Sequence, residues 1–328
     1  MGTVAAATSD DDGLWAVTCF VVRVGKRQPR RRAPRVAAVS LQMRVVEILL
    51  RLAYKPRMAT VERARKRIAE PKGSTEPPAR LRRRHDVRSR LVDGFPCHTV
   101  APRVRTATRA AVYLHGGAYI GEIAPQHWAL ISRLADAGVR VEVPNYGLAP
   151  QYTYREAYPL IAAVYRELLA EVDAATVTLV GDSAGGGLAL GFAQTLAEQD
   201  QPRQLVLLSP WLDLTISNPD VPAVEARDPW LSSLGLHEAA DAWAGGDDQT
   251  IPQLSPLNGP LAGLAPMHVY VGTHEICLPD VLLLEKRAAE QGARVDVTVC
   301  EGAVHVYPLV PAPEGRAAAR QIVADIAR

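Results

Sequence analysis

The chain has 328 residues, of which 48% are hydrophobic and 22% charged, and its formal net charge is +2. This composition is typical of a soluble globular protein with a sizeable core, and the length suits one large α/β domain with an elaboration or two small domains. An integral membrane protein is excluded, because no stretch approaches the length of a membrane span.

The charge is spread unevenly along the chain. Arginine is dense before residue 110, as in Arg30–Arg32 and Arg82–Arg84. Such a basic region could contact an anionic membrane surface, although a solvated basic face is the more common explanation. No aromatic residues alternate with these arginines, so we do not expect nucleic acid as a partner.

The four cysteines show neither a C-x-x-C motif nor a spacing typical of metal ligands, so we expect reduced thiols. The apolar stretch 14–22 follows three aspartates, where a secretory signal would carry basic residues. We therefore expect a cytoplasmic protein, with peripheral contact to a membrane as the alternative.

The N-terminal part of the chain divides into a tail and a helical region. Residues 1–40 combine an acidic cluster, a short apolar run and a Pro/Arg-rich segment, so we predict a disordered tail. Apolar residues at helical spacing predict a helix over 41–53, and a second helix is predicted over 59–69. We assign residues 41–84 to N-terminal cap helices and a linker, which includes Pro77 and Pro78.

From residue 85 onward, strand patterns alternate with helix patterns, and we assign residues 85–328 to a catalytic domain. Strands are predicted at 86–92, 96–101, 110–114, 140–143, 177–180, 204–208, 267–271 and 295–299. Helices are predicted at 128–137, 156–171, 188–198, 283–291 and 316–327. This alternation predicts an α/β fold with a mostly parallel eight-stranded sheet that helices cover on both faces. The Pro-rich segment 210–262 interrupts the alternation and is predicted to be an insertion over one end of the sheet.

One short segment carries the strongest chemical signal. The predicted strand 177–180 runs into Gly181-Asp182-Ser183-Ala184-Gly185, and an apolar, alanine-rich segment follows. The pattern G-x-S-x-G between a strand and a helix is the nucleophile elbow, which holds a serine hydroxyl clear of the sheet edge. The N-terminus of the following helix favours a developing oxyanion. The segment predicts that Ser183 is a nucleophile.

A serine nucleophile needs a base, and the base needs an acid that orients it. His305 lies in the loop after the last predicted strand, where an imidazole can reach a serine on a central strand. Glu275, Asp280 and Asp213 are the candidate acids, and all three fall between the serine and the histidine in chain order. We favour Glu275, because it follows the end of the predicted strand 267–271 most closely.

The tetrahedral intermediate of acyl transfer needs backbone N–H donors. Ala184, the residue after the nucleophile, should supply one donor. The loop His115-Gly116-Gly117-Ala118 follows a buried strand, and Gly116 and Gly117 should supply others, with Ala118 as a third candidate.

From about residue 85 to its C-terminus, and more loosely back to residue 41, the chain resembles the hormone-sensitive-lipase-like branch of the α/β-hydrolases, the bacterial family IV esterases. The resemblance rests on His115–Ala118, Asn145–Pro150, Gly181–Gly186, Ser209–Leu214, Gly272–Asp280 and His305. It implies the α/β-hydrolase fold and a helical cap built from residues 41–75 and the 210–262 insertion. Ala118 stands where the family usually has a third glycine, Glu275 where it has aspartate, and Gly147 where it has arginine.

The resemblance and the motifs together imply a serine carboxylesterase that acts on short- to medium-chain acyl esters without a metal or cofactor. The alternatives are an amidase or deacetylase with the same triad, and a binding protein on this fold that has lost catalysis. Candidate substrate contacts are Tyr119, Trp211, Trp230 and Asp182. The expected partner is a small acyl ester, and a homodimer stays open as an assembly.

Overall fold

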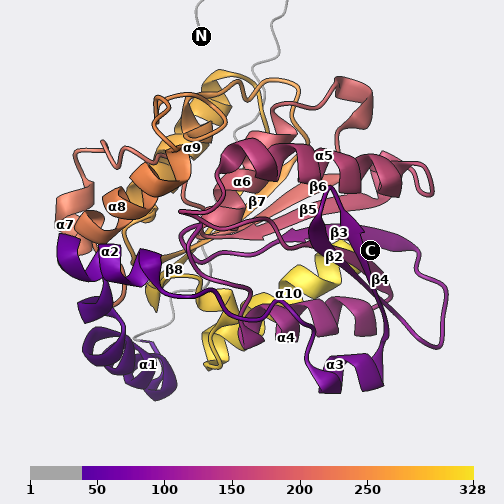
Figure 1. The fold of residues 1–328 in the computed structure, drawn as a ribbon, viewed down its shortest axis with the longest axis horizontal. Helices are drawn as coiled ribbons and strands as arrows, with labels where there is room; N and C mark the ends of the chain where they lie inside the picture. The colour runs from indigo at the N-terminus through magenta and orange to yellow at the C-terminus, as the bar shows by residue number, and fades with distance from the viewer. Residues whose placement is uncertain (1–38) are drawn as a thin grey trace, which may run out of the picture. The chain divides into compact units, whose positions relative to one another are not determined.

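The computed structural model describes residues 39–328 (Figure 1). Nearly all of the predicted tail, with Cys19, lies outside the described residues. Within them, Cys97, Cys277 and Cys300 are free thiols. Among residues 39–328, no helix is both long enough and apolar enough to cross a lipid bilayer.

An eight-stranded sheet forms the centre of the described part, which confirms the predicted fold class. Its strands are β1 (Asp86–Val92), β2 (Phe95–Ala101), β3 (Arg109–Leu114), β4 (Val139–Pro144), β5 (Val177–Asp182), β6 (Gln204–Leu208), β7 (Met267–His274) and β8 (Val295–Val304). Their spatial order is β1-β2-β4-β3-β5-β6-β7-β8. The first two pairs, β1 with β2 and β2 with β4, are antiparallel, and all later pairs are parallel. The central strands β3, β5 and β6 are therefore flanked on both sides, so they are buried and apolar.

Ten α-helices surround the sheet within the described residues. They are α1 (Leu41–Ala53), α2 (Val61–Ala69), α3 (Ala79–Arg84), α4 (Pro125–Asp136), α5 (Tyr154–Leu169), α6 (Ala184–Ala193), α7 (Val221–Glu225), α8 (Ser233–Ala244), α9 (Leu278–Glu290) and α10 (Pro313–Ala327). Short 3₁₀ segments lie at Lys55–Arg57, Ala174–Thr176, Glu198–Asp200, Pro256–Asn258 and Tyr307–Leu309.

The two faces of the sheet carry separate apolar clusters, because side chains alternate along a strand. On β3, Ala110, Val112 and Leu114 pack in a cluster with α5, α6, α8 and α9. Ala111 and Tyr113 point the other way and pack in a cluster with α4 and α10. Figure 1 shows α5 and α6 on one side of the sheet and α4 and α10 on the other.

Several element boundaries differ from the sequence-based expectation. The helix predicted at 188–198 is α6, which begins at Ala184 and ends at Ala193. It ends early because the Gln201 side chain donates to the carbonyl of Ala193 and the Thr195 hydroxyl donates to that of Phe192. The short helix α3 and the twelve-residue helix α8 were not predicted as separate elements, and β7 and β8 extend beyond their predicted ends.

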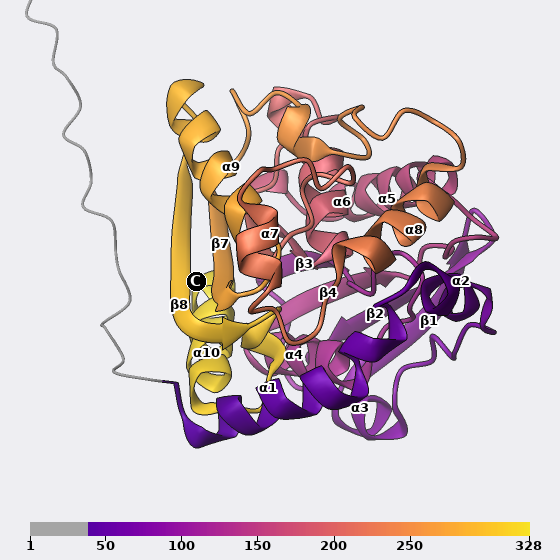
Figure 2. The ribbon, with the colours of Figure 1, turned by 90° about the vertical axis from the view of Figure 1, so that its left-hand side faces the viewer.

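The N-terminal helices contact the segment predicted as an insertion. Arg65 of α2 forms an ion pair with Glu238 of α8, and the backbone of Met58 lies so close to Gly235 that any added side chain there would clash. Figure 2 shows α1 and α2 on the same side of the described part as α7 and α8. These contacts suit a cap made of both segments, and the division into cap and catalytic domain stays a prediction.

Candidate active site

Ser183 occupies a sharp turn between β5 and α6. Its backbone has φ +52° and ψ −121°, a conformation that residues with a side chain rarely adopt. Hydrogen bonds hold the turn: the Ser183 N–H donates to the carbonyl of Leu208 at 2.8 Å, and its carbonyl accepts from the N–H of Trp211 at 2.9 Å. The turn points the hydroxyl out of the sheet edge, at the N-terminus of α6.

The helix after the serine approaches the sheet very closely. A Cβ on Gly185 would collide with the carbonyl oxygens of Leu114 and His115 at the end of β3. Only glycine fits at this point, since any side chain would push α6 away from the sheet. This close approach brings the loop after β3 beside Ser183.

A continuous chain of hydrogen bonds joins three of the predicted site residues. His305 Nε2 lies 2.9 Å from Ser183 Oγ, and His305 Nδ1 lies 2.7 Å from Glu275 Oε2. His305 follows directly after β8 and Glu275 directly after β7. Both side chains are buried, the glutamate completely. The arrangement can remove a proton from the serine hydroxyl and stabilise the imidazolium that results.

Two opposing effects act on the pKa of His305. Burial disfavours the charged imidazolium, but the hydrogen bond to Glu275 and the charge of that carboxylate favour it more strongly. The net result is a pKa raised above its usual 6.5. A raised pKa makes the imidazole a better proton acceptor, which suits a general base.

The carboxylate of Glu275 is held by two further donors. Its Oε1 accepts from Ser209 Oγ at 2.7 Å and from the N–H of Gly272 at 2.5 Å. Ser209 Oγ in turn accepts from the N–H of Val306, the residue after the histidine, at 2.9 Å. Ser209 therefore ties the acid to the loop that carries the base.

Asp228 supports the same loop from the segment predicted as the cap. It is fully buried, and its Oδ2 accepts from the N–H of Ile276, next to Glu275, at 2.9 Å. Its Oδ1 accepts from the N–H groups of Trp230 and Leu231. Burial raises its pKa, and three N–H donors and the nearby His305 oppose that effect.

The two other candidate acids lie elsewhere. Asp213 accepts from the hydroxyls of Thr215 and Ser217, so it closes a turn after β6. Asp280 accepts from the side-chain amide of Asn218, and burial raises its pKa to about 6. The structure gives neither carboxylate a hydrogen bond to His305.

The loop that carries the predicted oxyanion donors lies close to the serine, because a Cβ on Gly116 would come within 3.0 Å of Ser183 Cβ. Among residues 39–328, the N–H groups of Gly116, Gly117, Ala118 and Ala184 make no hydrogen bond. Gly117 has φ +125°, a value that favours glycine, and its carbonyl accepts from the N–H groups of Ile120 and Gly121 at 3.0 and 2.8 Å. The loop therefore leaves free N–H donors beside the nucleophile, as an oxyanion hole requires.

Two of the predicted substrate contacts support this loop. Tyr119 is buried, stacks between Trp211 and Trp243, and donates its hydroxyl hydrogen to the carbonyl of Ala184 at 2.9 Å. Asp182 is buried beneath the loop, where it accepts from the Tyr113 hydroxyl at 2.7 Å and lies 3.2 Å from His127 Nε2. Both side chains make hydrogen bonds within the protein and so support the loop, and contact of either one with substrate stays a prediction.

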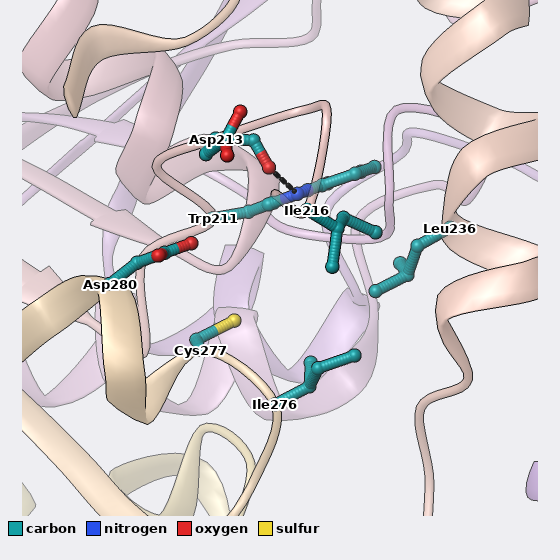
Figure 3. Close-up of a pocket in the computed structure, with 7 residues that line it drawn as sticks. All are labelled: Trp211, Asp213, Ile216, Leu236, Ile276, Cys277 and Asp280. Carbon is teal, nitrogen blue, oxygen red and sulfur yellow. Dashed lines mark hydrogen bonds between the residues drawn. The ribbon is translucent and has the colours of Figure 1, made fainter. Parts of the chain in front are cut away.

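A small hollow lies beside the segment that follows Glu275, between the end of β6 and α8 (Figure 3). Its volume is about 10 Å³, which is room for roughly one water-sized group. Its lining residues are Trp211, Asp213, Ile216, Leu236, Ile276, Cys277 and Asp280. In Figure 3 the indole of Trp211 and the side chains of Ile216, Leu236 and Ile276 surround the space.

Trp230, the remaining predicted substrate contact, packs edge-on against the His305 ring, with 5.8 Å between the ring centroids.

Glu275, Cys277 and His305 have metal-binding atoms that lie within 4.8 Å of one another. The histidine and the glutamate already share a hydrogen bond, which a metal ion would have to break. Burial raises the pKa of the Cys277 thiol well above its usual range, so the thiolate that a metal prefers is disfavoured. This group suits proton transfer better than metal binding.

Sequence reasoning missed Ser209 and Asp228. Ser209 stands directly after a predicted strand, at the sheet edge where the other site residues gather, and that position was a usable signal. Asp228 had no such signal, because it lies within an irregular segment and its partner Ile276 is 48 residues away.

Comparison with known proteins places this geometry among hydrolases. A family model described as an alpha/beta hydrolase fold matches residues 111–309. An acetyl-hydrolase of Streptomyces hygroscopicus is 34% identical over 67% of this chain and 77% of its own length. An esterase of Acinetobacter venetianus is 33% identical over 68% of this chain and 74% of its own length. The crystal structure of an esterase from the bacterial hormone-sensitive lipase family has a TM-score of 0.70 at 29% identity, and the match covers 84% of this chain and 98% of that one.

We predict that Ser209→Ala destabilises the protein and impairs the site. The change removes a hydrogen bond to a buried carboxylate, so we expect the free energy of unfolding to fall by about 1.5–3 kcal/mol. It also leaves Glu275 with one donor fewer, so the steady-state kcat for an ester should fall. Urea unfolding and initial rates measure the two effects. Ser217→Ala, which removes a similar bond to Asp213, is the control: a loss of kcat as large as that of Ser209→Ala would contradict the assigned role.

Proposed function

The chain belongs to the α/β-hydrolase fold family and is related to bacterial esterases of the hormone-sensitive lipase family. On that basis we propose that it hydrolyses short acyl esters, with Ser183, His305 and Glu275 as its catalytic triad. The family and its relatives make the chain an esterase- or lipase-like hydrolase. The triad and the acyl length are the parts that we propose.

The first half of the proposed reaction is acylation. Ser183 Oγ attacks the ester carbonyl while His305 Nε2 takes the hydroxyl proton, and Glu275 stabilises the imidazolium. The negative oxygen of the tetrahedral intermediate accepts hydrogen bonds from the loop after β3 and from Ala184. The intermediate then expels the alcohol, which leaves with the proton that His305 returns, and the acyl group stays on Ser183.

The second half is deacylation by water. His305 Nε2 removes a proton from a water molecule, and the hydroxide oxygen attacks the acyl carbonyl. The bond to Ser183 Oγ breaks, Oγ regains a proton from His305, and the carboxylic acid leaves. Neither half requires a metal or a redox cofactor.

One observation carries the proposal: the hydrogen bonds from Ser183 through His305 to Glu275 at 2.9 and 2.7 Å. A binding protein that had lost catalysis would not need this chain of bonds, or a nucleophile held in a strained backbone conformation. The arrangement therefore favours an enzyme over a ligand-binding member of the fold.

The small hollow beside the segment that follows Glu275 supports a short acyl group. The N–H of Trp211 donates to the Ser183 carbonyl, so one wall of the hollow belongs to a residue that holds the turn of the nucleophile. We propose that this space takes the methyl end of a short acyl group, because it has room for about one water-sized group. Leu236 of α8 closes it from the cap side.

We expect a fluorophosphonate probe to label the wild-type protein and not Ser183→Ala, because the probe reacts with an activated serine. We also expect hydrolysis of p-nitrophenyl acetate to be much faster than that of the corresponding anilide. Equal labelling of the variant would contradict the assignment of the nucleophile. Comparable rates on the ester and the anilide would favour the amidase alternative.

We predict that Glu275→Gln lowers kcat/KM by about 10³- to 10⁴-fold, since the amide cannot stabilise the imidazolium. The pH profile provides a second readout. In the wild type, kcat/KM should rise with pH as His305 loses its proton, with a midpoint above 6.5 because the carboxylate raises that pKa. Without the Glu275 carboxylate, the lowering effect of burial on the pKa of His305 is opposed less, so the midpoint of the pH profile should move to lower pH. Asp280→Asn is the comparison, and an equal loss of kcat/KM in that variant would refute Glu275 as the acid.

We predict that Leu236→Ala shifts the acyl preference toward longer chains, because it enlarges the hollow. The ratio of kcat/KM for p-nitrophenyl hexanoate to that for the acetate should increase by about tenfold. Leu234→Ala is the matched control, since Leu234 lies on the same helix and is 51% exposed. An unchanged ratio in Leu236→Ala would show that the acyl group binds elsewhere.

A further inference from the structure

We propose that helix α1 is a docking surface for an anionic lipid bilayer, where its outward apolar side chains and the surrounding basic residues hold the enzyme beside the surface that supplies its ester. Binding to lipid stands independently of the catalytic assignment. The supply of ester from that surface rests on the proposed function.

The first observation is a row of exposed apolar side chains, here called the α1 face. Its members are Leu41, Val45, Ile48, Leu49 and Leu52, with exposed fractions of 75%, 47%, 57%, 56% and 72%. Single exposed leucines are common on soluble proteins, but five on one helix form a contiguous patch. Such a patch marks an interaction site more often than a bare surface.

The second observation is the direction of this face. At 100° per residue, the five side chains fall within about 100° of one another around the helix axis. Met43 and Leu50, which are buried, lie on the opposite side and join the apolar cluster of α4 and α10. Figure 2 shows α1 along the edge of the described part. Helix α1 thus has two apolar faces. The inner one packs against the protein, and the outer one, the α1 face, is exposed.

The third observation is the charge around the face. Residues 41–57, which comprise α1 and the short segment after it, contain four lysines and arginines but only one glutamate. Within the described part of the chain, Arg44 and Arg57 have no carboxylate within ion-pair distance. A second copy of this chain would bring an equally basic segment against this one in a symmetric pair. Lipid phosphates complement the charge, so an anionic bilayer is the better occupant.

The fourth observation connects the α1 face to the active site. Tyr54, 45% exposed at the C-terminal end of α1, packs edge-on against Trp230 at 6.0 Å. Trp230 packs against the ring of His305 at 5.8 Å. Lys55 Nζ donates to the carbonyls of Glu225 and Asp228 in the segment that contacts the triad loop. The C-terminal end of α1 is therefore joined to the ring of His305 through Tyr54 and Trp230.

The test is vesicle sedimentation with the full chain carrying Ser183→Ala, so that lipid turnover does not affect the result. We expect binding to vesicles that contain phosphatidylglycerol, and much weaker binding to pure phosphatidylcholine or at high salt. Adding Ile48→Gln and Leu52→Gln should weaken binding by about tenfold or more, since both side chains would insert in the interface. Adding Arg44→Gln or Arg57→Gln should weaken it by about fivefold each.

Leu91→Gln and Val104→Gln are the matched controls, because these side chains are 71% and 97% exposed but lie outside the α1 face. They should bind as the parent does. Equal binding by the parent and the Ile48→Gln/Leu52→Gln variant would overturn the proposal. Absence of vesicle binding, together with a dimer in sedimentation equilibrium that this variant dissociates, would also overturn it and assign the face to a second copy.

Discussion

The buried charge of Glu275 is the constraint on which the rest of the site depends. A fully buried carboxylate is costly unless hydrogen bonds satisfy it, and here Ser209, the N–H of Gly272 and His305 do so. The three donors come from residues at or just after the ends of β6, β7 and β8. The parallel order of these strands therefore sets the catalytic geometry, because only adjacent strand ends can converge on one carboxylate.

The other half of the site depends on β3 and β5 in the same way. Their pairing, together with the close approach of α6 at Gly185, brings the donor loop beside the nucleophile. Buried polar contacts then fix the loop: the Tyr146 hydroxyl donates to the carbonyl of His115 at 2.5 Å, and Tyr119 donates to that of Ala184. Such donors are effective in catalysis because they are already oriented before the negative charge develops.

The sequence predicted the fold class and the residues that the structure brings together, because both leave local signals. Strand and helix patterns alternate visibly, and a glycine-flanked serine between them is distinctive. Supporting residues leave weaker signals, since their roles depend on contacts far apart in the chain. Ser209 meets Glu275 across 66 residues. The early end of α6 likewise depends on Gln201, whose side chain reaches back to the helix. Proximity in sequence to the motifs suggested that Asp182 and Tyr119 contact substrate, but it could not reveal the hydrogen bonds that both residues make within the protein.

Asp228 gives the segment after β6 a role beyond covering the site. Its carboxylate accepts from the N–H of Ile276, so a residue from outside the sheet supports the loop that carries Glu275, the proposed catalytic acid. Exchanging this segment for that of a relative would leave a buried N–H without an acceptor unless the graft brought a carboxylate to the same point. A chimera that exchanges this segment would therefore have to rebuild the hydrogen bond that supports the Glu275 loop.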